Sequence, residues 1–412
     1  MNRRLGYAMS LLLGTVVACG GHGNSGAPGD AGGSVGDDAS GGGGKDGGKG
    51  SDGGQGSDGG GGGGGDSSAP DGGPATDANA ADSKAPATDG GVPAGWLYTV
   101  AGDNHVYLSN GGSGTVWMGR GVNMDDLFLC GYNEGFWMTN PSGEAALTGM
   151  LSALMTDWKP TFLRVSLAMN SYPPYGISWA GNTSMYATLM TSLIDAIGGY
   201  PNTYVLITLR SEASMVNASN AQCAMGGDDA VCIPTAGTDA TYKALVDTFK
   251  DKSYVLFGIS NEPGGNDGTQ TQITSAMSHA VGTIRAEEDA LGVPHHLVSV
   301  QGLGYTSNIA FYDSAPLPYD NVVYEFHSYP PQASAYTQSK IPVIIGEYGP
   351  SGTDTSFATA LYADLEAKHI PNLAWDLDTY NDCAPDLATV TGTVAITPSA
   401  WGQVVKSYLN AH

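Results

Sequence analysis

Residues 255–263 read VLFGISNEP, and residues 343–349 read VIIGEYG. Each is a short, almost wholly apolar run that leads into a glutamate, Glu262 in the first and Glu347 in the second. Continuous apolar runs of this length are typical of strands buried on both faces, as in parallel sheets. Similar runs recur on either side of these two, and together they predict eight strands: 116–123, 161–168, 204–210, 255–261, 297–302, 322–327, 343–347 and 372–376.

Stretches with apolar residues three and four positions apart separate the predicted strands. Strands alternating with helices imply a parallel sheet with right-handed crossovers. Eight such units favour a closed α/β barrel, the (β/α)8 TIM barrel, over the alternative of a doubly wound open sheet. A hairpin near residues 96–98 and 105–107, followed by a turn at 108–114, is expected before the barrel. The predicted helices cover 143–158, 184–197, 242–250, 275–291 and 355–369.

Both glutamates fall at the C-terminal ends of their strands, where such barrels carry their chemistry. A carboxylate emerging from an apolar strand is costly unless it has partners or a function. Taken singly, Glu262 or Glu347 could be a helix-capping or salt-bridged residue. Two carboxylates facing each other across a barrel mouth, however, form the pair that glycoside cleavage requires. One protonates the leaving oxygen, and the other attacks or stabilises the anomeric carbon.

Over nearly all of residues 94–412 the chain resembles glycoside hydrolase family 5, the cellulase-type group of the 4/7 barrel superfamily. No single motif identifies this family, but the order and spacing of several motifs along the predicted barrel do. The motifs are FLRVSL with Arg164, NEP at Asn261 to Pro263, EFHSYP with His327 and Tyr329, GEYG with Glu347, and LAWDLD with Trp375.

This resemblance implies that Glu262 is the acid/base and Glu347 the nucleophile of a retaining, double-displacement reaction. Arg164 would then hydrogen-bond the nucleophile and keep it ionised. The carboxyl groups should lie about 5 to 5.5 Å apart, because a gap near 9 Å indicates inversion. We expect no cofactor and no metal. The supporting or sugar-binding residues would be Asn261, His327, Tyr329 and Trp375, with His295 and His296 left as surface or packing residues.

One position departs from the family pattern. Where family members commonly end the third strand with a histidine, this chain has LITLRSEA, with Thr208 and Arg210. Arg210 could reach a sugar hydroxyl, or it could pair with Glu212 as a structural residue. Substrate preference therefore stays open between β-1,4-glucan, the first choice, and β-mannan. Aromatic residues in the loops 172–179 and 303–312 are suited to stacking on sugars.

Two other functional classes compete with a glycoside hydrolase. A non-catalytic polysaccharide-binding surface lipoprotein is the alternative to an enzyme, although binding alone would not require both glutamates. A serine esterase is disfavoured because the domain has no Gly-x-Ser-x-Gly elbow. The net charge of -24 argues against a nucleic-acid partner, since phosphate contacts need Lys and Arg.

The sequence of the first 93 residues predicts an export signal and a linker rather than a folded domain. Residues 1–18 combine Arg3 and Arg4 with a short apolar run and small residues, as in a signal peptide, and Cys19 follows as in a bacterial lipobox. Lipidation of Cys19 would anchor the protein at the cell envelope or surface, whereas an ordinary signal peptide is the alternative. Residues 19–93, rich in glycine, predict a disordered linker with a reach of about 50 Å, and 94–412 form the catalytic domain.

Four cysteines remain besides Cys19, and an even number in an exported chain favours two disulfides. Cys223 with Cys232 and Cys130 with Cys383 are the favoured pairs among the three possible pairings. We expect a monomer that meets a polysaccharide or oligosaccharide substrate and touches a membrane only through its lipid.

Overall fold

The computed structural model describes residues 91–124, 143–168, 186–210, 233–263, 268–329, 340–350, 352–377, 387–391 and 395–412. The expected signal peptide, Cys19 and nearly all of the glycine-rich linker lie outside these residues. The expected disulfide cysteines also lie outside them: Cys130, Cys223, Cys232 and Cys383.

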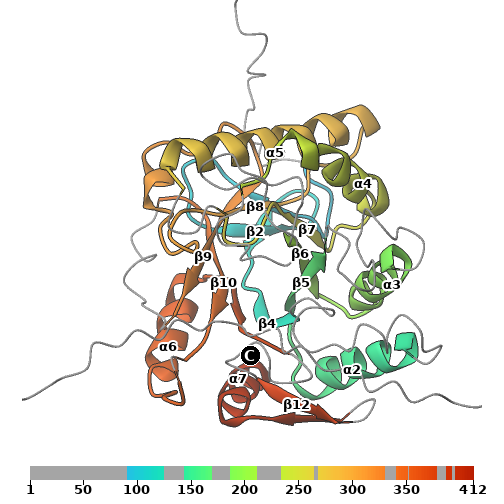
Figure 1. Cartoon of the computed structure of the whole chain (residues 1–412), viewed down its shortest axis with the longest axis vertical. Coiled ribbons are helices and arrows are strands. Elements are labelled where there is room, and N and C mark those ends of the chain that lie inside the picture. The colour runs from blue at the N-terminus through green and yellow to red at the C-terminus, as the bar shows by residue number, and fades with distance from the viewer. Residues whose placement is uncertain are drawn as a thin grey trace, which may run out of the picture. The chain divides into compact units, whose positions relative to one another are not determined.

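Eight parallel strands form a closed barrel, as predicted (Figure 1). Closure is made by pairing of the last strand with the first, with Asn372 opposite Arg120, which rules out the open sheet. In order around the barrel the strands are β4 (Arg120–Met124), β5 (Phe162–Ala168), β6 (Tyr204–Arg210), β7 (Val255–Gly258), β8 (Val298–Val300), β9 (Val322–Ser328), β10 (Val343–Tyr348) and β11 (Asn372–Ala374).

Helices lie around the outside of the strands (Figure 1). The longest, α5, begins with a capping box between Thr269 and Gln272 and ends at Gly292, which has a left-handed backbone. Within the described ranges, no helix is both long and apolar enough to cross a membrane. The helices are α2 (Gly143–Asp157), α3 (Tyr186–Gly198), α4 (Asp239–Phe249), α5 (Gln270–Leu291), α6 (Ala358–Lys368) and α7 (Ala400–Ala411), with short 3-10 turns η2 (Ala236–Thr238) and η3 (Ala310–Asp313).

Two small antiparallel sheets accompany the barrel. At the N-terminus, β1 (Leu97–Thr99), β2 (Val106–Ser109) and β3 (Gly114–Val116) form a three-stranded sheet rather than a simple hairpin. The first barrel strand therefore begins at Arg120, not at Val116 as predicted. Val116 instead pairs with Tyr107 of β2.

The second small sheet, β12 (Ala388–Thr391) with β13 (Ala395–Pro398), was not predicted. Nor was the helix α7 that follows it.

Side chains fill the barrel in layers. One layer of apolar side chains in the barrel interior includes Leu206, Leu256, Val323, Ile344 and Leu373. Two residues further along several strands, toward their C-terminal ends, the inward positions become polar, yet they are at most 1% exposed. A buried polar layer is costly unless its members bind one another, so it marks the region below the barrel mouth as the place to look for a site. The layer consists of Asn123, Arg164, Thr208, Ser299 and Glu325.

Candidate active site

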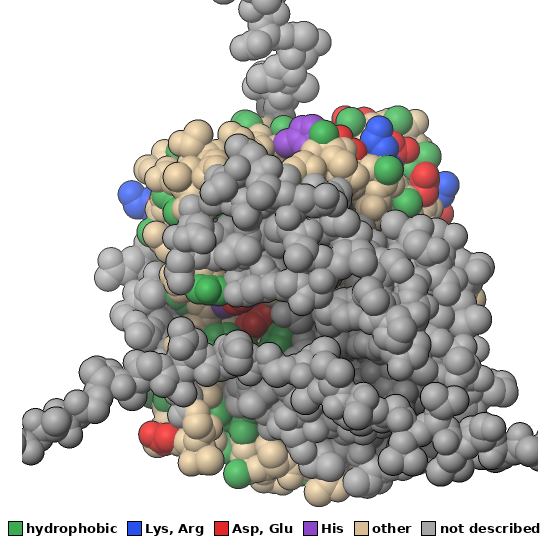
Figure 2. All heavy atoms as spheres, viewed as in Figure 1, with side chains coloured by type: hydrophobic (Ala, Val, Ile, Leu, Met, Phe, Trp, Pro, Cys, Tyr) green, Lys and Arg blue, Asp and Glu red, His purple; other side chains and the backbone are tan. Residues whose placement is uncertain are grey.

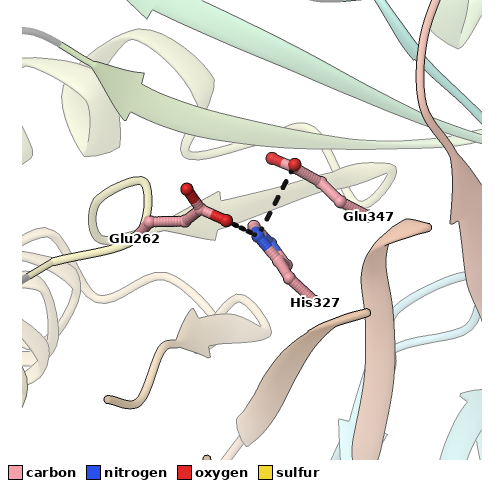
Figure 3. Close-up of side chains that lie close together, drawn as sticks. All are labelled: Glu262, His327 and Glu347. Carbon is pink, nitrogen blue, oxygen red and sulfur yellow. Dashed lines mark hydrogen bonds and ion pairs between the residues drawn. The ribbon is translucent and has the colours of Figure 1, made fainter. Parts of the chain in front are cut away.

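Glu262, four residues after β7, and Glu347, near the end of β10, converge on one cleft. A carboxylate oxygen of Glu262, a carboxylate oxygen of Glu347 and a ring nitrogen of His327 lie within 4.8 Å of one another (Figure 3). Figure 2 shows acidic side chains at the floor of a hollow in the surface. The cleft has a volume of about 550 Å³ and is lined by Glu262, Gly304, Tyr305, Ser307, His327, Tyr329, Glu347 and Trp375.

A bulge in β10 turns Glu347 toward the cleft. Ile344 faces the barrel interior and Ile345 faces the helices, so strict alternation would point Glu347 outward. The pairing with β9 shifts register between Ile345 and Glu347, and Gly346 is the extra residue. Glu347 therefore pairs with His327 and shares its inward direction. Bulges commonly re-aim a side chain beside an active site in this way.

Glu262 is held in an unusual backbone conformation. It follows β7 with φ of 45°, in the left-handed region that residues other than glycine rarely adopt. Its N–H donates to the Oε1 of Gln301, an atom that also accepts a 2.9 Å hydrogen bond from the Thr306 hydroxyl. Such strain costs about 1 to 3 kcal/mol and persists only where the surroundings enforce it. Gln301 and Thr306, both completely buried, help to hold Glu262 in this conformation.

Arg164 is the central cation beneath the cleft. Its Nη1 donates to Oε1 of Glu347 over 2.7 Å and to Oδ1 of Asn123 over 2.9 Å. Its Nη2 donates to Oδ1 of Asn261 over 2.6 Å. Asn123 in turn donates to the carbonyl of Gly346, the bulge residue, over 2.9 Å. Because Arg164 is only 1% exposed, its charge acts on Glu347 with little screening by water and stabilises the ionised carboxylate.

His327 lies between the two glutamates (Figure 3). Its Nδ1 is 2.9 Å from Oε1 of Glu262 and 3.6 Å from Oε2 of Glu347, and its Nε2 is 2.9 Å from Oε1 of Glu325. Burial alone would lower the pKa of His327, but Glu347, Glu262 and Glu325 outweigh that effect and raise the pKa to about 9. At neutral pH the ring is an imidazolium that donates from both nitrogens.

Two aromatic residues predicted for the site also lie in the cleft. The Tyr329 hydroxyl donates to Oε2 of Glu347 over 3.0 Å. Desolvation and the negative charge of Glu347 raise the pKa of the Tyr329 phenol well above 10, so it stays a donor. Trp375 lines the cleft while only 7% exposed, and its carbonyl accepts from the Trp401 indole over 2.9 Å.

The trio of Glu262, His327 and Glu347 is close enough to be considered as a metal site. An imidazolium has no lone pair to offer, however, and both of its N–H groups already point to carboxylates. The donor set at neutral pH therefore suits proton transfer better than metal binding. His295 and His296, predicted as surface or packing residues, bind Asp320 and Glu288 respectively at 2.9 and 2.8 Å.

Other predicted positions have mixed outcomes. Arg210 ends β6 opposite Ala168, but its side chain lies outside the described part, as do Glu212 and the loop 172–179. In the loop 303–312, Tyr305 lines the cleft and is 38% exposed, whereas Tyr312 is fully buried core.

The sequence reasoning missed three polar residues that support the site: Asn123, Gln301 and Glu325. Glu325 is the most unexpected, because it is 0% exposed inside the barrel. A signal was present, since Glu325 stands two residues before His327 and so shares its face of the strand. The bulge at Gly346 and the strained Glu262 had no such signal, because both depend on contacts between strands.

Comparison with known proteins identifies the family. The model of the cellulase family, glycosyl hydrolase family 5, matches residues 120–381, which span every barrel strand and both glutamates. The chain belongs to glycosyl hydrolase family 5. A search of curated proteins gave no match.

Solved structures share the fold of this family 5 chain at low sequence identity. A β-glucanase from Saccharophagus degradans in complex with cellotetraose matches with a TM-score of 0.55 and 14% identity, covering 77% of this chain and 93% of that one. A β-mannanase from Streptomyces thermolilacinus with mannohexaose matches with a TM-score of 0.53 and 17% identity, covering 77% and 96%. The catalytic domain of alkaline cellulase K matches with a TM-score of 0.53 and 16% identity, covering 80% and 96%.

Proposed function

We propose that this family 5 protein is a retaining glycoside hydrolase that cleaves β-linked polysaccharide, with β-1,4-glucan as the first substrate class and β-mannan as the second. The observation that carries the proposal is the approach of Glu262 and Glu347, whose nearest carboxylate oxygens lie within 4.8 Å in one cleft. Retaining enzymes place their two carboxyl groups about 5 to 5.5 Å apart, whereas inverting enzymes need roughly 6.5 to 9.5 Å to admit a water.

In the first step, Glu347 attacks the anomeric carbon while the bond from that carbon to the leaving oxygen breaks. The leaving oxygen takes a proton from Glu262. His327 donates to Oε1 of Glu262, so Oε2 carries the proton that is transferred. Arg164 and Tyr329 donate to the two oxygens of Glu347 and fix the direction from which it attacks.

In the second step, Glu262 acts as a base. It takes a proton from a water molecule, whose oxygen bonds to the anomeric carbon as the bond to Glu347 breaks. Two displacements at the same carbon restore its original configuration. Asn261 precedes Glu262 and is held through its Oδ1 by Arg164, and we assign it a hydrogen bond to a substrate hydroxyl near the reacting carbon.

The walls of the cleft support a pyranose substrate. Tyr305 and Tyr329 present partly exposed aromatic side chains, 38% and 41%, and Trp375 completes an aromatic lining around the carboxylates. Aromatic faces beside hydrogen-bonding groups are suited to sugar rings, which have apolar faces and polar edges. Two of the similar solved structures contain oligosaccharides, cellotetraose in one and mannohexaose in the other, which supports these two substrate classes for this chain.

A polysaccharide-binding protein without catalysis is the competing proposal. It would explain the aromatic cleft, but not the strained backbone of Glu262 or the cations arranged around both glutamates. Binding sugar hydroxyls does not require a carboxylate held against a buried arginine. The arrangement therefore favours turnover.

The two proposals are separated by assaying the full chain on soluble β-glucans, β-mannans and xylans. Glu347→Gln and Glu262→Gln should each lower kcat on the order of 10³-fold or more while glycan binding persists. Glu366→Gln is the matched control, because Glu366 also binds an arginine but lies on α6 away from the cleft. Binding without turnover by the unmodified chain would establish the non-catalytic role.

We further propose that residues 1–18 direct export, that Cys19 carries the lipid anchor, and that residues 19–93 tether the domain 94–412 to the cell envelope. The lipobox-like position of Cys19 and the glycine-rich composition support this. Cys19→Ser should release the protein from membranes in a fractionation experiment. Retention of that variant would show that the anchor is something else.

A further inference from the structure

A third glutamate lies directly beneath the proposed catalytic pair. Glu325 is on β9, two residues before His327, and its carboxylate faces the barrel interior with 0% exposure. Its Oε1 lies 3.0 Å from Nε of Arg164 and 2.9 Å from Nε2 of His327, and its Oε2 accepts a 2.7 Å hydrogen bond from Ser299. One buried carboxylate thus binds both cations of the site.

We propose that Glu325 is a positioning residue for hydrolysis, which clamps Arg164 behind the nucleophile and His327 behind the acid/base. The inference rests on the proposed function, because it assigns Glu325 a role in that reaction. Arg164 reaches Glu347 with Nη1 while Glu325 lies against its Nε. His327 reaches Glu262 with Nδ1 while Glu325 holds its Nε2. Each cation is therefore fixed from both sides.

The fold makes room for this carboxylate at a specific point. A Cβ on Gly346 would lie 2.0 Å from Oε1 of Glu325, and the next two nearest atoms also belong to the Glu325 side chain. Gly346 is the bulge residue that turns Glu347 into the cleft. Gly346 therefore provides both the bulge that directs Glu347 into the cleft and the space that the Glu325 side chain occupies.

The charges around Glu325 explain why it stays ionised despite its burial. Burial raises the pKa of Glu325, but the charge of Arg164 and the hydrogen bonds from His327 and Ser299 outweigh it and bring the pKa to about 2. A packing role alone would be filled at lower cost by an apolar side chain. What a carboxylate adds here is a fixed direction for two cations, since it accepts hydrogen bonds from His327 and Ser299 and lies 3.0 Å from the guanidinium of Arg164.

The chain itself provides a matched control. Glu288 is also 0% exposed and also binds an arginine and a histidine, Arg285 at 2.6 Å and His296 at 2.8 Å. It lies on α5, and neither it nor its partners line the cleft. Glu288→Gln removes the same kind of buried charge as Glu325→Gln without touching the proposed machinery. Both variants should lower the melting temperature, so stability alone does not distinguish them.

Turnover is the first readout. In the full chain, Glu325→Gln should lower kcat on the order of 100-fold, as expected when reacting groups lose their alignment, with KM within about twofold of the unmodified value. Glu288→Gln should keep both constants. A Glu325→Gln protein that is folded and keeps kcat within about twofold would overturn the proposal.

The protonation of His327 is the second readout, and it does not depend on activity. With ¹⁵N-labelled histidine, the eight histidines of the full chain can be observed by NMR, and the His327 signal is assigned by its loss in His327→Gln. In Glu325→Gln the imidazolium of His327 should lose its proton at least one pH unit lower than in the unmodified chain. An unchanged midpoint would contradict the proposal. If the unmodified chain hydrolyses no glycan, the proposed function fails, and this midpoint still decides whether Glu325 controls His327.

Gly346→Ala tests the same contact without removing any charge, in case Glu325→Gln does not fold. It should lower kcat strongly in the unmodified chain, because the new methyl group displaces the Glu325 carboxylate. In a Glu325→Ala background it should add little, since the atoms it would meet are gone. An equal loss in both backgrounds would show that Gly346 acts independently of Glu325 and would count against the clamp.

Discussion

The Nδ1 of His327 lies 2.9 Å from the Oε1 of Glu262 and donates to it as an imidazolium. This bond leaves the other oxygen of Glu262, Oε2, for the proton transfer that the proposed mechanism assigns to it. It also connects Glu262 to the buried charges below, because the other ring nitrogen of His327 reaches Glu325. Glu262 and Glu347 are thus parts of one network that Arg164 completes from the side of Glu347.

Replacing Arg164 should damage both stability and turnover. Arg164→Met leaves Glu347 and Glu325 buried without their shared cation, and breaking a buried pair costs about 3 to 5 kcal/mol. Arg120→Met is the control, because the Arg120 pair with Glu366 is partly exposed and should contribute about 0 to 1 kcal/mol. Chemical denaturation measures both variants. Equal losses would show that the Arg164 network does not hold the site together.

Tyr329→Phe should slow the reaction without weakening substrate binding. It removes the 3.0 Å hydrogen bond to Glu347, and a bond to a charged group contributes about 1.5 to 3 kcal/mol, or roughly 10-fold to 100-fold in kcat. Tyr408→Phe removes a comparable bond to Glu366, outside the cleft, and should leave kcat unchanged. Steady-state kinetics of the two variants decide this, and an unaffected Tyr329→Phe enzyme would remove Tyr329 from the mechanism.

Tyr305 should contribute to binding rather than to chemistry. Its side chain lines the cleft and is 38% exposed. Tyr305→Ala should raise KM about tenfold, equivalent to about 1.4 kcal/mol, with kcat nearly unchanged. Tyr305→Phe keeps the ring and should retain the original KM. If both variants behave alike, the ring does not stack on the substrate.

Much of the barrel could be predicted from the chain because its signals are local. The apolar runs at 204–210 and 343–347 coincide with or fall within β6 and β10, since strands buried on both faces need continuous apolar sequence. The start of the first strand was misplaced because Val116 has the same β-branched character whether it pairs with Tyr107 or with the barrel. Only tertiary pairing separates the two.

The site was partly predictable for the same reason. Glu262 and Glu347 were visible as carboxylates at the ends of apolar strands. Glu325 was not singled out, because a glutamate within an apolar run can be paired, exposed or at a bend, and its partners Arg164 and Ser299 are distant in sequence. The left-handed backbone of Glu262 likewise depends on Gln301, a residue of another strand's end.

Stability should fall as the pH rises from about 7 to about 9. The pKa of His327 is about 9 in the folded chain and near 6.5 when unfolded. The charged ring therefore stabilises the folded chain fully below pH 6.5, and this stabilisation is lost as the pH rises through 9. The groups facing its ring are the carboxylates of Glu262, Glu325 and Glu347. His327→Gln should flatten this decline in denaturation experiments at pH 6.5 to 9.5. His295→Gln is the control, because it leaves the contribution of His327 in place; equal slopes for the unmodified chain and His327→Gln would refute the assignment.

The configuration of the first sugar released tests the cooperation of Glu262 and Glu347 most directly. The full chain is mixed with a soluble β-1,4-linked oligosaccharide, and the anomeric protons are followed by ¹H NMR before mutarotation is complete. Double displacement predicts that the β-anomer appears first and the α-anomer only later, as solution equilibrium is reached. Initial release of the α-anomer would mean that Glu347 does not bond to the sugar, and would contradict the account.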